Sequence, residues 1–224
     1  MLPMLPLVFD ANGLIPVIAL DHLTGEVRMF AFASAESVLA TLTTKRATFF
    51  SRSRGEIWEK GKTSGHTLEV KRVYVDCDTD ALVYAVEPTG PTCHTGAETC
   101  FFQALDEDRA LTPDATGATL MSRLEARLDA RRTSTSEKSY TKSLYEAGPE
   151  AIGEKVREEA DEFARAIAEE STDRAASEAA DVVFHLLVGL RARGIGWREV
   201  LGKLEGRLGT SGHAEKASRE RLDE

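Results

Sequence analysis

The period of the hydrophobic residues changes once along this chain of 224 residues, and that change constrains the fold more than any other feature. In the first hundred residues, short β-rich runs alternate with turns that contain Gly, Asp or Pro, which is typical of strands. After residue 119, apolar residues recur at helical spacing, and we expect four amphipathic helices there. The expected strands are 14–20, 27–33, 47–51, 67–75 and 82–86, with one helix at 35–43 that Ser34 can cap.

A polar segment separates the two patterns. Residues 106–119 read DEDRALTPDATGAT and contain no apolar period, which is typical of a linker. We therefore predict an α+β protein of two domains, the first mainly β and the second an all-α helical bundle. The predicted boundaries are 1–105 for the first domain, 106–119 for the linker, 120–209 for the second domain and 210–224 for a flexible tail.

Charge and hydropathy exclude several classes of function. With 37 acidic and 28 basic residues, the formal net charge of −9 disfavours sequence-independent nucleic-acid binding, which needs a basic surface. No run approaches the roughly 20 apolar residues that span a bilayer, so we expect no membrane partner. The start, MLPMLPLVFDANG, lacks the basic region of a signal peptide, and we expect a cytoplasmic protein.

The three cysteines are the first candidate site. Cys77, Cys93 and Cys100 are an odd number within one short segment, which favours a metal site over a disulfide framework. Three thiolates are the number that a catalytic zinc uses when its fourth position is left for water. His94 could be a fourth ligand or an acid/base. The alternative is three inert cysteines that pack as small apolar residues.

Two groups of carboxylates are further candidates. Asp76, Asp78 and Asp80 follow a β-like run and project to one side if they are extended, where they could hold Mg²⁺; a solvated turn is the alternative. In the helical half, Glu159 and Glu162 lie three residues apart on one helix face, and Glu178 and Asp181 repeat that spacing. Two inward-facing pairs on facing helices can hold cations, whereas a single such pair is usually a solvated face.

Three strings in the first half carry a family resemblance. They are FFSRSRGEIWEKGKTSGH at 49–66, DCDTD at 76–80 and EPTGPTCHTGAETCF at 87–101. Several motifs in this order make the chain resemble phosphoribosyl-AMP cyclohydrolase, an enzyme of histidine biosynthesis, over about 14–102. The resemblance implies zinc on Cys77, Cys93 and Cys100, at a site shared between two subunits of a dimer, and Mg²⁺ on Asp76, Asp78 and Asp80.

The implied reaction opens the adenine ring by attack of a zinc-bound hydroxide, since zinc lowers the pKa of bound water to about 7. His94 is the candidate for moving protons. Candidates for binding the ribose phosphates are Arg52, Arg54, Lys60, Thr63 and Ser64, although the two arginines could equally be ordinary surface charges. The chain departs from the family pattern at Lys62, at Phe32-Ala33-Ser34 and at Leu20, which bears on substrate affinity more than on metal binding.

The second half carries another resemblance. The strings SYTKSLYEAG at 139–148, KVREEADE at 155–162 and SEAADVVFHLLVGL at 177–190 resemble phosphoribosyl-ATP pyrophosphohydrolase, one of the all-α nucleotide pyrophosphohydrolases. This resemblance implies Mg²⁺ on Glu159, Glu162, Glu178 and Asp181, with Glu158 as a ligand or water-activating base. Lys155 could contact phosphate, and His185 could orient Asp181 or be an ordinary core residue. Arg157 stands where Gly is usual.

The two resemblances are consecutive steps of one pathway. The expected protein is a bifunctional hydrolase and a homodimer that binds Zn²⁺ and Mg²⁺, whose second domain converts phosphoribosyl-ATP to phosphoribosyl-AMP before the first domain opens the ring. Two alternatives are a general nucleoside-triphosphate pyrophosphohydrolase whose first domain has drifted, and a non-catalytic metal-binding assembly protein. Detection of zinc and of divalent-dependent hydrolysis distinguishes the last of these from an enzyme.

Overall fold

The computed structural model describes residues 5–114, 119–133 and 139–208, so the predicted tail at 210–224 lies outside the described residues. The chain forms two compact units, Met1–Thr119 and Leu120–Glu224. The first unit is rich in strands and the second is helical, as the change in hydrophobic period predicts. No helix in the described part of the chain is long and apolar enough to cross a membrane.

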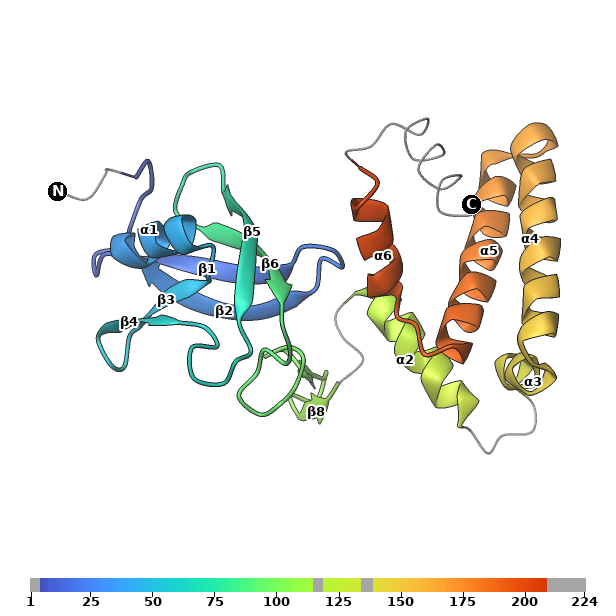
Figure 1. Cartoon of the computed structure of the whole chain (residues 1–224), viewed down its shortest axis with the longest axis horizontal. Coiled ribbons are helices and arrows are strands. Elements are labelled where there is room, and N and C mark those ends of the chain that lie inside the picture. The colour runs from blue at the N-terminus through green and yellow to red at the C-terminus, as the bar shows by residue number, and fades with distance from the viewer. Residues whose placement is uncertain (1–4, 115–118, 134–138, 209–224) are drawn as a thin grey trace, which may run out of the picture. The chain divides into compact units, whose positions relative to one another are not determined.

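A six-stranded sheet organises the first unit (Figure 1). Its strand order is β4-β3-β2-β1-β6-β5, and all neighbouring strands are antiparallel except β1 and β6. The five predicted strands are all present, whereas β4 was not predicted because it is short and begins and ends with glutamate. The strands are β1 (Leu14–Asp21), β2 (Val27–Ser34), β3 (Thr48–Ser51), β4 (Glu56–Glu59), β5 (Leu68–Val75) and β6 (Leu82–Pro88).

The sheet curls so that its two ends meet. Residues just before β3 bond to β5, at the far end of the strand order: the amide of Ala47 donates to the Leu68 carbonyl at 3.0 Å, and the amide of Val70 donates to the Lys45 carbonyl at 2.7 Å. The curled sheet encloses an apolar core, in which the rings of Phe49 and Tyr84 stack with centroids 5.8 Å apart. Closing the sheet satisfies backbone groups that an open edge would expose.

Helix α1 (Ala35–Thr44) packs against the β2–β4 part of the sheet. The predicted cap is confirmed: Ser34 Oγ accepts from the Ser37 amide, and the Ser37 hydroxyl oxygen accepts from the Ser34 amide. The helix ends at Lys45, whose φ of 58° lies in the left-handed region. This turn sends the chain into the backbone bridge with β5.

A short hairpin follows the sheet, in a segment that we predicted to be partly linker. Strands β7 (Gln103–Leu105) and β8 (Leu111–Pro113) pair antiparallel, so β8 lies within the predicted linker 106–119. Asp106 builds the turn, because its carboxylate accepts from the Ala110 amide at 2.8 Å. Both strands are only three residues long and mostly exposed, and they therefore leave no apolar alternation in the sequence.

Five helices form the described part of the second unit, where we predicted four. The two longest, α4 and α5, have 21 residues each and lie side by side (Figure 1). The helix that was not predicted is α3, which has only eight residues between its cap Ser139 and Gly148. The helices are α2 (Leu120–Arg132), α3 (Tyr140–Ala147), α4 (Pro149–Glu169), α5 (Thr172–Ala192) and α6 (Trp197–Glu205).

The core of the helical unit gathers one or two apolar residues from most of its helices. Leu128 of α2, Leu144 of α3, Ile152 of α4, and Leu187 and Val188 of α5 are buried together. The predicted apolar helix at 182–190 is the second half of α5, whose first half carries Glu178 and Asp181. The core thus fixes the two helices that carry the predicted acidic residues.

The buried Tyr84 in the core of the first unit is expected to make the fold less stable at alkaline pH. Burial raises the pKa of Tyr84 from 10.0 to about 12. The unfolded chain therefore loses this proton first, so stability is retained below pH 10 and falls between pH 10 and about 12. We expect the free energy of unfolding to fall in that window by about 2–3 kcal/mol more in the natural chain than in Tyr84→Phe. The measurement is denaturant unfolding at a series of pH values. If the free energy of unfolding fell by the same amount in both proteins, this expectation would be wrong.

Candidate functional site

The loop after β6 brings two of the three cysteines together. Gly96, with a φ of 89°, allows a tight turn in which the Cys93 amide donates to the Ala97 carbonyl at 3.0 Å. The amide of Cys100 then donates to the Arg28 carbonyl on β2 at 2.9 Å. The two thiols are close enough for each to shift the pKa of the other. The prediction that this loop folds back to place both sulfurs together agrees with the structure.

The two thiols differ in acidity. Burial raises the pKa of the Cys93 thiol, but hydrogen bonds from Thr95 and from Cys100 outweigh this effect and lower the pKa below its ordinary value. The Thr95 hydroxyl lies 3.2 Å from the Cys93 sulfur. Desolvation and the neighbouring Cys93 raise the pKa of Cys100 to about 11, while Lys60 opposes them. Cys93 is thus the thiol that ionises first, and the thiolate is the form that binds metals.

Cys77 lies apart from this pair. It is exposed on the loop between β5 and β6, where its sulfur lies 3.9 Å from a carboxylate oxygen of Asp78. Among the described residues, no group of three or more close ligand atoms contains a cysteine. One copy of the chain therefore brings together Cys93 and Cys100 but does not add Cys77 to them.

A cleft of about 1110 Å³ opens beside the cysteine pair. The turn at 60–66 forms one wall, and a Cβ atom at Gly61 would lie 2.3 Å from the His66 carbonyl oxygen, so only glycine fits this turn. Burial lowers the pKa of Lys60, although the nearby thiols of Cys100 and Cys93 raise it. The predicted site residues that line the cleft are Arg54, Lys60, Thr63, Ser64, Cys93, His94 and Cys100, together with Lys62.

Arg52 lies outside this cleft. Its guanidinium carbon is 4.1 Å from the centroid of the Phe32 ring, an arrangement typical of a cation–π contact. Arg54 lines the cleft but also pairs with Glu56 at 2.9 Å, and both side chains are exposed. Of the two predicted arginines, only Arg54 therefore lines the cleft that contains Cys93 and Cys100.

A buried charged network, which the sequence analysis missed, holds the cysteine loop. Arg28 on β2 pairs with the fully buried Asp21 at 2.8 Å and with Glu98 at 3.1 Å, and it also donates to the Glu98 carbonyl. The Thr99 hydroxyl donates to the Val27 carbonyl at 2.7 Å. A buried arginine on a strand gives no signal in hydrophobic spacing. The role of Arg28 is to fix the segment between Cys93 and Cys100 against the sheet.

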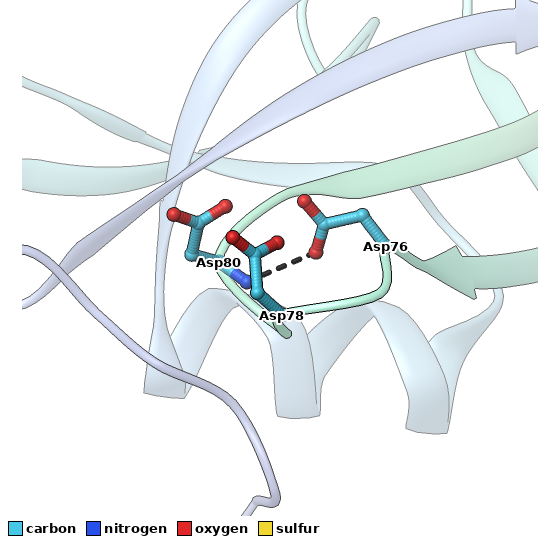
Figure 2. Close-up of side chains that lie close together, drawn as sticks. All are labelled: Asp76, Asp78 and Asp80. Carbon is cyan, nitrogen blue, oxygen red and sulfur yellow. Dashed lines mark hydrogen bonds between the residues drawn. The ribbon is translucent and has the colours of Figure 1, made fainter.

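The three predicted aspartates gather on the β5–β6 loop. Figure 2 shows their carboxylates turned to one side of the loop, and their oxygen atoms lie within 4.8 Å of one another. The amides of Asp80 and Ala81 each donate to Asp76 at 3.0 Å, and these hydrogen bonds, the one from Ala81 above all, lower the pKa of Asp76. The charge of Asp78 raises the pKa of Asp80. Such a group of oxygen ligands suits Mg²⁺.

Four predicted carboxylates gather between α4 and α5. Oxygen atoms of Glu159, Glu178 and Asp181 lie within 4.8 Å of one another, and the Glu162 carboxyl group is close enough to raise the pKa of Glu178. Glu178 is buried, and this burial raises its pKa; Arg174 opposes the rise, whereas Glu162 and Asp181 add to it. Arg174, which pairs with Glu178, was not predicted. Repulsion among these groups favours a bound cation.

Further polar side chains surround this carboxylate group. Lys155 bonds to Glu158 at 2.7 Å and lies 3.4 Å from Glu159. The Nδ1 atom of the buried His185 faces the Glu159 carboxylate at 3.7 Å, and its Nε2 atom lies 3.0 Å from the hydroxyl of Tyr140. The same Nδ1 atom lies 2.9 Å from the backbone carbonyl oxygen of Asp181, so the hydrogen bond at this nitrogen is with the backbone of Asp181 and not with Glu159. No role was predicted for Tyr140 from the sequence.

Comparisons with known proteins agree with both halves of this arrangement. The family model for phosphoribosyl-AMP cyclohydrolase matches residues 29–102, and that for phosphoribosyl-ATP pyrophosphohydrolase matches residues 121–207. The chain is 44% identical over 206 residues to a histidine biosynthesis bifunctional protein, HisIE, of Deinococcus radiodurans, covering 91% of this chain and 93% of that protein. The chain belongs to this bifunctional family. The family resemblance inferred from the motifs is confirmed.

Other relatives match the whole chain or its first half. A HisIE protein of Wolinella succinogenes is 39% identical over 217 residues, which cover 94% of this chain and 95% of that protein. A phosphoribosyl-AMP cyclohydrolase of Methanoregula boonei is 54% identical over 103 residues, which cover 46% of this chain and 84% of that protein. The first unit of this chain therefore has relatives that occur without a second, pyrophosphohydrolase unit of the kind found here.

The buried network predicts which arginine matters for the stability of the first unit. Arg28→Ala removes the guanidinium partner of the buried Asp21, which is expected to cost about 3–5 kcal/mol of unfolding free energy. Arg54→Ala removes an exposed ion pair and is expected to cost at most about 1 kcal/mol. The measurement is urea unfolding followed by Trp58 fluorescence in a Trp197→Phe background. Equal losses in the two variants would contradict the buried-network account.

Proposed function

We propose that the chain carries out two successive hydrolyses. The second unit converts phosphoribosyl-ATP to phosphoribosyl-AMP and pyrophosphate, and the first unit then opens the adenine ring of phosphoribosyl-AMP. The observation that carries this proposal is the presence of both family domains, in this order, in a chain that aligns over most of its length with bifunctional histidine-biosynthesis proteins. The separate ligand groups in the two units support it.

In the second unit, the metal ligands we propose are Glu159, Glu162, Glu178 and Asp181. Their clustered oxygens suit Mg²⁺, which, when bound, neutralises the polyphosphate and polarises the bond to be cleaved. Lys155 lies beside Glu159 and can bind a phosphate oxygen, while Glu158, which is exposed next to Lys155, can accept a proton from the attacking water. His185 lies beside these ligands, with its Nδ1 atom 3.7 Å from Glu159 and 2.9 Å from the Asp181 carbonyl oxygen.

In the first unit, we propose that Cys93 and Cys100 are two of three zinc ligands. The lowered pKa of Cys93 supports this assignment, because it favours the thiolate. Cys77 forms no close ligand group with the pair within one chain, so a second copy is proposed to supply it, and we propose a homodimer for that reason. Zinc bound there supplies the acidity that a water molecule needs to attack the purine ring at neutral pH.

The cleft beside Cys93 and Cys100 is the proposed site for phosphoribosyl-AMP. Lys60, Arg54, Thr63 and Ser64 can donate hydrogen bonds to its phosphate, and Lys62 adds a further positive charge at the same wall. His94 lines the cleft next to Cys93 and can hand a proton to the ring nitrogen that is released. Asp76, Asp78 and Asp80 are the proposed Mg²⁺ ligands of this unit. Thiols kept as metal ligands favour a reducing compartment, which supports a cytoplasmic location.

Single substitutions should separate the two reactions. Cys93→Ala removes a proposed zinc ligand, so ring opening is expected to fall by about a hundredfold or more, whereas pyrophosphate release stays within about twofold. Asp181→Asn removes a proposed Mg²⁺ ligand, so pyrophosphate release from phosphoribosyl-ATP is expected to fall by about a hundredfold or more. Ring opening of separately supplied phosphoribosyl-AMP is expected to stay within about twofold.

The assay follows pyrophosphate release and the ultraviolet absorbance of the purine ring with each substrate. If Cys93→Ala abolishes both reactions, or if neither substitution alters its own reaction, the assignment of one reaction to each unit is wrong. Faster hydrolysis of ordinary nucleoside triphosphates than of phosphoribosyl-ATP would instead favour a general pyrophosphohydrolase.

A further inference from the structure

The helical unit contains a cleft that has no role in the chemistry described above. It has a volume of about 420 Å³ and opens between α2 and α3. Its polar lining comes from Arg127 and Arg131 of α2, and from Ser139, Tyr140 and Thr141 at the start of α3, while Leu128 and other apolar side chains complete it. It therefore combines two cations with hydroxyl groups on a partly apolar surface.

The charges of α2 are divided between two faces. Its two acidic residues, Glu125 and Asp129, both pair with Arg191 of α5, at 3.7 Å and 2.6 Å. Arg127 and Arg131 lie one turn apart on the face that lines the cleft, and neither forms an ion pair with any carboxylate in the described ranges. Two neighbouring guanidinium groups without a carboxylate partner form an attractive site for a phosphate group, which arginine binds through paired hydrogen bonds.

The cleft is connected to the carboxylate group through two side chains. Tyr140 lines the cleft, and its hydroxyl lies 3.0 Å from Nε2 of His185. The other ring nitrogen of His185 faces Glu159 at 3.7 Å. The cationic cleft and the carboxylates are thus separated by the rings of Tyr140 and His185. A ligand with two anionic ends could place one at each site.

The substrate of the proposed function has two such ends. Phosphoribosyl-ATP carries the triphosphate that is cleaved and, on the opposite side of the purine, a second ribose with its own 5-phosphate. The carboxylates and their cations occupy the position at which the triphosphate must react. The second phosphate therefore needs a separate cationic site, and ordinary nucleoside triphosphates have no group to fill it.

We propose that the cleft formed by Arg127, Arg131, Ser139 and Thr141 binds the 5-phosphate of the phosphoribosyl group and selects phosphoribosyl-ATP over ordinary nucleoside triphosphates. This inference rests on the proposed function of the second unit. The arginines bind the phosphate oxygens, and the hydroxyls of Ser139 and Thr141 donate to them. Ser139 retains its proton for this purpose, because its oxygen accepts from the Lys142 amide.

The test compares Arg127→Gln and Arg131→Gln with Arg123→Gln in the full chain. Arg123 is an exposed arginine of the same helix outside the cleft, so its substitution is the matched control. The first readout is the ratio of KM for phosphoribosyl-ATP to the inhibition constant of ATP, which lacks the second ribose phosphate. We expect this ratio to rise about tenfold or more in each cleft variant and to stay at its natural value in the control.

The second readout is calorimetric titration with ribose 5-phosphate, which needs no catalysis, with every chain also carrying Lys60→Gln to weaken the proposed phosphate site of the first unit. We expect the otherwise natural chain and Arg123→Gln to bind it alike, and both cleft variants to bind it about tenfold more weakly. An unchanged ratio with unchanged ribose 5-phosphate binding would overturn the proposal, and so would equal weakening of phosphoribosyl-ATP and ATP. Arg127→Lys keeps the charge and is expected to recover part of the affinity, which distinguishes a lost contact from a damaged fold.

Failure of the proposed function would look different. If the natural chain released no pyrophosphate from phosphoribosyl-ATP, the function of the second unit would be wrong. The ribose 5-phosphate titration would still decide whether the two arginines form a sugar-phosphate site.

Discussion

Both candidate centres depend on holding groups of like charge close together. Carboxylates within 4.8 Å of one another repel when ionised, and two thiols that share a site cannot both ionise easily. The fold must therefore supply the energy that keeps these groups in place. Burial raises the pKa of Glu178 and of Cys100, and the neighbouring acidic groups raise both further. A bound cation would turn the same repulsion into binding energy.

The two units meet this constraint by different means. In the helical unit, the long helices α4 and α5 present the carboxylates from a rigid packed pair, and the cations of Arg174 and Lys155 offset part of the charge. In the strand-rich unit, the groups lie on loops, so local hydrogen bonds must fix them. Backbone amides hold Asp76, and the buried pair of Arg28 with Asp21 secures the cysteine loop.

The sequence predicts the parts of this structure that have a clear period or a clear motif. Five of the six strands of the sheet and the Ser34 cap follow from apolar alternation and capping chemistry. The acidic spacing on α4 and α5 predicts the carboxylate group. The strands β4, β7 and β8 and the eight-residue α3 were missed, because these short elements leave little apolar pattern, whereas the equally short but apolar β3 was predicted. Arg28 and Tyr140 act through contacts between distant segments, which spacing along the chain does not reveal. Arg52, a candidate phosphate ligand on the chemistry of its guanidinium group, lies over the Phe32 ring and does not line the cleft beside the cysteine pair, and its role stays a prediction.

The most direct test of the account is a time course on phosphoribosyl-ATP with the full natural chain, Zn²⁺ and Mg²⁺. Pyrophosphate release and the ultraviolet change of ring opening are followed in the same sample. If one chain performs both hydrolyses in the proposed order, pyrophosphate appears first, and ring opening follows after a lag as phosphoribosyl-AMP accumulates. Ring opening that precedes or lacks pyrophosphate release, or pyrophosphate release that ring opening never follows, would contradict the account.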